Sequence, residues 1–228
     1  MEFFEAVHKR RSVREYSNKP VPRDVMIKAF EAAQLSPNSS NMQTWGFYWV
    51  KSDDKKTKLV EACLNQNSAK TAQELVVAVA HRGMWKQNAK EMARRLKEQG
   101  ADEKVILYYD KLMPFTYGLS FLAPIKWLIF NGLGLFRPMI RRPYSSRDVD
   151  EVCIKSTALA CENFMLAVSA QNFDTCPMEG FDESRVKKIL GLKCSSRVVM
   201  VISVGERVEK GIWGKQIRFP FDTFMKEV

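Results

Sequence analysis

Hydrophobic residues follow two periods along the chain, one typical of helices and one of strands. The most regular helical pattern is Ile154, Ala158, Cys161, Met165 and Val168, which repeats every three or four residues without an intervening proline or glycine. This spacing predicts a long helix in the core. Shorter helices are predicted at residues 2–9, from Pro20–Asp24 to Ser36, at 91–99 and at 182–190.

Apolar runs rich in β-branched and aromatic residues predict four strands, at 45–50, 75–80, 173–176 and 198–204. The first of them is aromatic and apolar on both faces, which favours a buried strand. Helices and strands alternate irregularly, and no internal boundary divides the 228 residues into two parts. The pattern therefore predicts a single α+β domain with a sheet sandwiched by helices.

Residues 112–143 are an unusual stretch, in which apolar segments surround Lys126. The longest uncharged piece, residues 127–136, has ten residues and is too short to cross a bilayer as a helix. A basic cluster follows it: Arg137, Arg141 and Arg142.

The formal charge of +10 is compatible with nucleic acid, an anionic membrane surface or phosphorylated small molecules. No zinc-finger spacing, RNP-like aromatic signature or long basic helix is present, so no nucleic-acid partner is expected. Five cysteines without a Cys-x-x-Cys pair predict reduced thiols rather than a metal or disulfide site, and His8 and His81 are expected to be structural. The N-terminus lacks the apolar stretch of a secretory signal, which predicts a cytoplasmic location.

Arg10, Arg11, Ser12 and Arg14 put three guanidinium groups and a hydroxyl within five residues. An arginine fork matches the oxygens of a phosphate group, and a serine adds one neutral donor. A solvated basic turn would have the same composition. These residues alone leave both interpretations open.

Two further motifs occur at matching intervals. Taken together, Arg10–Tyr16, Ser36–Trp45 and Cys176–Asp182 resemble the nitroreductase family of FMN enzymes, over roughly residues 1–80 and 150–228. The resemblance implies an α+β fold with a central mixed, mainly antiparallel sheet surrounded by helices. It also implies a domain-swapped homodimer, with the flavin in clefts at the subunit interface.

The resemblance implies a role for each motif. The first would hold the FMN phosphate and the pyrimidine end of the ring, where Arg14 would stabilise the reduced flavin. The second would reach the flavin from the partner subunit, although Thr44 stands where the family usually has proline. The third would meet flavin N5 through its backbone. The implied cofactor-binding residues are Arg10, Arg11, Ser12, Arg14, Pro37, Asn38, Ser39, Asn67, Lys70, Pro177, Met178, Glu179, Gly180, Lys215 and Arg218.

The family reaction is ping-pong: NAD(P)H reduces FMN, which then passes electrons to a nitroaromatic, quinone or related unsaturated acceptor. No Gly-x-Gly-x-x-Gly follows a strand, so the hydride donor is expected to stack on the flavin itself. No catalytic side chain and no metal are expected, because the flavin carries the chemistry. Reductive dehalogenation, flavin fragmentation and membrane-surface flavin binding without turnover remain alternatives.

The middle of the chain is unmatched by the resemblance and is interpreted as an insertion at about residues 84–150. It would either roof the flavin and select substrates or, through residues 112–143, lie on anionic lipid as a peripheral membrane contact. Both interpretations stay open, and they are compatible with each other.

Overall fold

A four-stranded sheet with the strand order β1-β2-β4-β3 forms the centre of the computed structural model, which describes residues 1–118, 120–140 and 142–228. Its strands are β1 (Trp45–Val50), β2 (Glu74–His81), β3 (Asp174–Met178) and β4 (Ser196–Gly205). All three strand pairs are antiparallel. An isolated bridge between Ser12 and Thr175 adds a parallel pairing outside the four strands, and the predicted α+β fold with a mainly antiparallel sheet surrounded by helices is confirmed.

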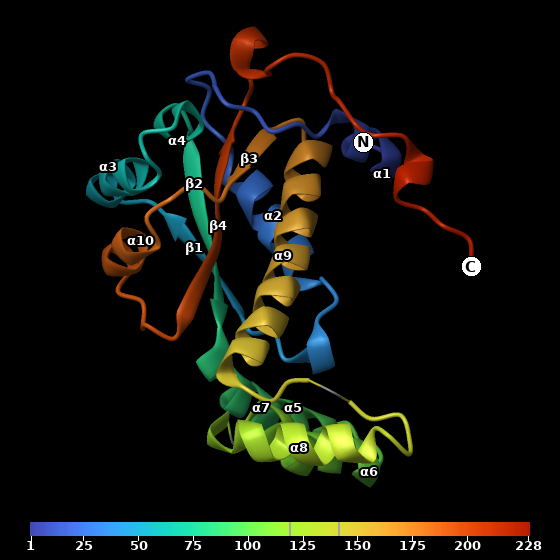
Figure 1. The fold of residues 1–228 in the computed structure, drawn as a ribbon. Helices are drawn as coiled ribbons and strands as arrows, with labels where there is room; N and C mark the ends of the chain where they lie inside the picture. Colours follow the sequence, from blue (N-terminus) through green and yellow to red (C-terminus); the bar gives the residue numbers. More distant parts are fainter. Residues whose placement is uncertain (119, 141) are drawn as a thin grey trace.

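Helices cover both faces of this sheet (Figure 1). On one face α9 (Ser146–Ala170) and α2 (Arg23–Gln34) pack against Val76 and Ile202. On the other, α3 (Asp53–Ala62) and α10 (Glu183–Leu190) pack against Val77 and Val201. Neighbouring residues of one strand thus enter opposite cores, because side chains alternate between the faces of a sheet.

The helix α9 is the long core helix that the apolar spacing predicts. It begins at a capping box, in which the Ser145 hydroxyl accepts from the Asp148 N–H and the Asp148 carboxylate accepts from the Ser145 N–H. Among the described residues it is also the one helix long and apolar enough to cross a membrane. Its contacts with α2 and the sheet explain that composition, because it packs in the core of the fold.

A group of short helices, at the place of the predicted insertion and called by that name below, lies between β2 and α9, at the opposite end of the molecule from the N-terminus (Figure 1). It contains α5 (Trp85–Glu98), α6 (Glu103–Leu107), a π-helical turn (Tyr108–Leu112), α7 (Met113–Tyr117) and α8 (Ala123–Leu133). The buried residue Asp150, at the start of α9, joins the insertion to the sheet. Its carboxylate accepts from Arg82, at the start of the insertion, and from Arg197 of β4. Two residues of the predicted segment 112–143, Leu119 and Arg141, lie outside the described residues.

Several predicted boundaries were wrong. The strand β1 is an edge strand and mostly half-buried, because it has one neighbour and its aromatic residues border an open groove. The strand β3 runs to Met178, two residues beyond its expected end, and α5 begins six residues before its predicted start. The short helix α1 (Phe3–Lys9) matches its prediction. The helices α3 and α4 (Asn67–Lys70) were not predicted, because they have too few apolar residues for a periodic pattern, and the short helices α6, α7 and α8 were not predicted either.

Candidate active site

The basic segment 10–16 forms a strap across the end of β3 and the chain that follows β4. Val13 is fully buried, and its N–H donates to the Thr175 carbonyl at 3.0 Å. The next residue, Arg14, donates its N–H to the Gly211 carbonyl at 2.8 Å. Alternating contacts of this kind hold the strap extended and leave its arginines half-exposed.

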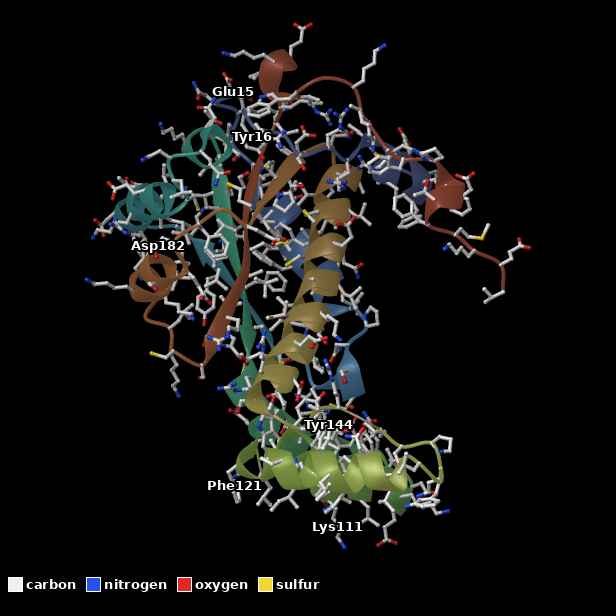
Figure 2. All side chains as sticks on the ribbon, in the orientation of Figure 1. Glu15, Tyr16, Lys111, Phe121, Tyr144 and Asp182 are labelled. Atoms are coloured by element: carbon white, nitrogen blue, oxygen red, sulfur yellow. The ribbon has the colours of Figure 1, made fainter. Side chains whose placement is uncertain are left out.

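Tyr16 anchors the far end of the strap. Its hydroxyl lies 2.8 Å from the Ser203 hydroxyl, and burial raises the pKa of this phenol well above its usual value. A Cβ on Gly205 would come within 2.8 Å of the Tyr16 ring, so glycine permits this close packing. Figure 2 shows Glu15 and Tyr16 together at this end of the sheet. The strap is therefore pinned on both sides of Arg14.

The guanidinium groups of the strap are poorly neutralised. Arg14 lies over the Trp213 ring, 4.3 Å from its centroid, and forms no ion pair among the described residues. Arg10 has a single carboxylate neighbour, Glu162, at 3.8 Å, and Arg11 donates to the Gly214 carbonyl. This arrangement fits an anionic group such as a phosphate, because Arg14 has no ion pair among the described residues and the ion pair of Arg10 is long and half-exposed.

The strap also lies beside the third motif. Burial raises the pKa of the Cys176 thiol, while the positive charges of Arg14 and Arg10 act in the opposite direction, so both charges lie near this residue of β3. The buried hydroxyl of Thr175, which pairs with Ser12, has no hydrogen-bond partner within the described part of the chain. Strap and β3 thus form one polar, positively charged corner.

The Pro177–Gly180 motif is half strand and half loop, whereas the predicted strand ends before it, at residue 176. Pro177 and Met178 belong to β3, and a proline is tolerated there because β3 is an edge strand. Exposed Glu179 and Gly180 follow. Gly180 accepts a hydrogen bond from Gln66, just before α4, at 2.7 Å.

The helix α4 carries the looser pair of predicted residues. Asn67 donates to the Glu15 carboxylate of the strap at 3.4 Å, so this residue does lie at the corner. Lys70 is exposed at the other end of the same short helix. Strap, α4 and Pro177–Gly180 are therefore brought together by the fold.

The C-terminal residues of the prediction lie on an exposed tail. Lys215 follows Gly214, whose carbonyl accepts from Arg11, so the tail begins next to the strap. Arg218 donates to the neighbouring Ile217 carbonyl, and no described contact brings its guanidinium to the strap. Within the described ranges no group of three or more His, Cys, Asp or Glu side chains is placed to hold a metal.

The Pro37–Ser39 loop stands apart from this corner. Exposed Pro37 and Ser39 lie beside α9, where the Ser39 N–H donates to the Ser156 hydroxyl. Asn38 fixes the turn by accepting from the Gln43 N–H at 2.8 Å. No hydrogen bond or ion pair joins this loop to the strap in the described part of the chain.

Sequence reasoning missed the residues that support these two regions. Three tyrosines of the insertion hold the loop: Tyr117 bonds the Ser39 hydroxyl, Tyr108 bonds the Ser40 hydroxyl, and Tyr109 donates to the Ser40 carbonyl. Trp213, which stacks on Arg14, was missed as well. The one signal in the sequence was a tryptophan between Gly211 and Gly214, in a mainly basic segment.

Gly211 allows us to test the strap without touching a charge. A Cβ at this position would overlap the Glu15 carbonyl oxygen, so Gly211→Ala must displace the strap next to Arg14. We expect at least about tenfold weaker FMN binding, since losing one charge-assisted hydrogen bond costs roughly 1.5 kcal/mol or more. Titration by flavin fluorescence measures this, with Gly83→Ala as the control because a Cβ there meets open space. Unchanged affinity in Gly211→Ala would contradict the role of the strap.

The fold and the corner define a class of α+β protein with a fixed, positively charged corner at the end of an antiparallel sheet. The family model "Nitroreductase family" matches residues 7–206, and the chain belongs to this family.

Individual proteins agree with this family. The chain is 26% identical to MhqN of Bacillus subtilis, named as an NAD(P)H nitroreductase, over 99% of this chain and 98% of MhqN. The crystal structure of the B. subtilis nitroreductase ydfN resembles it with a TM-score of 0.78 at 24% identity, covering 99% and 98% of the two chains. A nitroreductase of Exiguobacterium sibiricum, solved in complex with FMN, has a TM-score of 0.75 at 22% identity, covering 100% of this chain and 98% of that one.

Proposed function

We propose that this protein transfers electrons from NAD(P)H through FMN to nitroaromatic, quinone or related unsaturated acceptors. The observation that carries the proposal is the strap beside β3, where Arg14 forms no ion pair among the described residues and Arg10 forms one, to Glu162 at 3.8 Å. The enzyme class, an FMN-dependent NAD(P)H oxidoreductase, is that of the family to which the chain belongs. We further propose these acceptors, the two-step order of the reaction and a cytoplasmic location.

Each part of the corner has a separate task in this proposal. Arg10 and Ser12 bind the phosphate, because guanidinium and hydroxyl donors suit its oxygens. Arg14 places its charge at the pyrimidine end of the ring, held in position by Trp213. Glu179 and Gly180 offer exposed backbone at the reactive edge. When bound, FMN supplies hydride acceptance and electron delivery, and the protein supplies position and electrostatics.

We also propose that the working form is a homodimer. The Pro37–Ser39 loop is exposed and separate from the strap, so a second copy would be needed to bring such a loop to the flavin. Apolar residues are exposed on α1 and the outer side of α9, among them Phe4 and Leu159, and on the tail, among them Phe219 and Phe221. A partner subunit would cover these residues. In this arrangement the insertion, fixed to the loop by its tyrosines, would roof the partner's flavin.

The test is the absorbance of the purified protein, followed by anaerobic mixing with NADH or NADPH. We expect a flavin spectrum that bleaches on reduction and returns when a quinone or nitroaromatic compound is added. Protein that takes up no FMN would overturn the proposal. Bound flavin that NAD(P)H does not bleach would leave the binding site and remove the proposed donor.

A further inference from the structure

Exposed apolar residues gather on the outer side of α8, on the turn before it and on the segment after it. We call this group the α8 face, and it consists of Phe121, Ile125, Trp127, Leu128, Ile129, Leu133, Leu135, Phe136 and Ile140, all of which are exposed. Leu135 and Phe136 are 81% and 88% exposed. Single exposed apolar residues are ordinary on protein surfaces, but nine of them within twenty residues of the chain indicate a contact surface.

The single charged residue of α8 lies on the opposite side. Lys126 is buried, and its ammonium donates to the Gly118 carbonyl at 2.8 Å. Burial lowers the pKa of this lysine, since it disfavours the charged form. A helix facing water would have the reverse arrangement, with lysine outside and Trp127 or Leu128 inside.

The inner side of α8 is already occupied, so its outer side cannot be covered by a rotation of the helix. Phe130 packs its ring against Phe115 at 5.8 Å and against Tyr144 at 5.8 Å. Figure 2 shows Tyr144 between the insertion and α9, with Phe121 at one end of the insertion and Lys111 at its outer edge. The α8 face therefore points away from the body of the protein.

The charge along the segment that carries this face has one sign. Between Asp110 and Asp148 the sequence contains six basic residues and no acidic residue. Among those described, Lys111 and Arg137 are exposed, and the Arg142 side chain is 70% exposed although it reaches Glu151 at 3.6 Å. Two copies meeting through the α8 face would bring these like charges together, whereas an anionic surface would neutralise them.

We propose that the α8 face binds the surface of an anionic lipid bilayer. The eleven residues of α8 extend about 16 Å, so the helix lies in the plane of the interface rather than crossing it. The apolar side chains enter the boundary between headgroups and acyl chains, where tryptophan is favoured, and Arg137 and Lys111 meet anionic headgroups. This binding does not depend on the flavin chemistry, and it brings the protein to where lipid-soluble acceptors are concentrated.

Flotation of the flavin-loaded protein with vesicles tests the proposal. We expect binding to phosphatidylcholine vesicles that contain phosphatidylglycerol, much weaker binding to pure phosphatidylcholine, and loss of binding as salt rises. Leu128→Gln with Phe136→Gln should lower the partition coefficient at least about tenfold, because each change removes a large apolar group from the interface. Arg137→Gln should lower binding to the anionic vesicles by about fivefold, since one basic residue near such a surface contributes about 1 kcal/mol.

Matched controls separate this surface from general stickiness and charge. Val105→Gln changes an exposed apolar residue on α6, outside the α8 face, and Lys55→Gln removes an exposed positive charge on α3. Both should bind vesicles as the unchanged protein does, and circular dichroism and flavin content should be equal in all variants. The proposal is overturned if the unchanged protein stays in the aqueous phase, or if the double variant floats equally well. It is also overturned if the double variant dissociates an assembly of the protein while neither form binds vesicles, because the occupant is then a second copy.

Discussion

Replacing Arg10 and Arg14 together with alanine is expected to weaken FMN retention by about a hundredfold or more. Each hydrogen bond from a charged donor contributes about 1.5–3 kcal/mol, and 1.4 kcal/mol corresponds to a factor of ten. The replacement leaves little unpaired charge behind, because Arg14 has no ion pair among the described residues and Arg10 lies 3.8 Å from a half-exposed carboxylate. The effect should therefore fall on the cofactor rather than on the fold.

Equilibrium titration with FMN, followed by flavin fluorescence, measures this loss. Arg23→Ala is a matched control, because Arg23 stacks on Trp49 much as Arg14 stacks on Trp213, yet it belongs to no predicted site. Lysine at positions 10 and 14 should give intermediate affinity, since an ammonium keeps the charge but not the two-pronged geometry of a guanidinium. If the double alanine variant retains FMN as tightly as the unchanged protein, the strap is not the phosphate site.

The sequence was most informative where one physical requirement determined the residues. The regular apolar spacing of α9 predicted its place because a helix buried against a sheet needs a continuous apolar stripe. The valine-rich runs of β2 and β4 predicted the two central strands, because a strand covered by helices on both faces needs apolar side chains on both. The three motifs located the strap and the end of β3 before any geometry was available, and the structure places these two regions side by side.

Other features depend on partners that the local sequence does not specify. The aromatic residues of β1 predict a buried strand, but the topology decides whether a strand has one neighbour or two, and β1 has one. Lys126 can be buried because its ammonium donates to carbonyls eight and ten residues away. The sequence around Lys126 gives no sign of these contacts. The tyrosines that hold the Ser39–Ser40 turn lie about 70 residues further along the chain, so only the fold reveals them.

Phe164→Ala is expected to lower the free energy of unfolding by about 3–5 kcal/mol. Phe164 of α9 is fully buried, and its ring lies 5.1 Å from that of Phe30 on α2 and 6.2 Å from that of Phe47 on β1. Removing it leaves a cavity where two helices and the sheet meet, and such a cavity cannot collapse because α9 is held along its whole length. The loss is large compared with the 5–15 kcal/mol typical of whole domains.

Chemical denaturation measures this difference, and it should be carried out at saturating FMN and fixed protein concentration, because ligand and partner binding both stabilise the folded state. Phe164→Leu keeps much of the volume and should cost less than about 1.5 kcal/mol. Val105→Ala, on the exposed side of α6, should stay within about 0.5 kcal/mol. Since α9 also carries Ser156, which bonds the Ser39 backbone, and Glu162 beside Arg10, loosening its core should weaken FMN binding in Phe164→Ala as well. A Phe164→Ala protein as stable as the Phe164→Leu protein would show that this aromatic cluster does not hold α9 against the sheet.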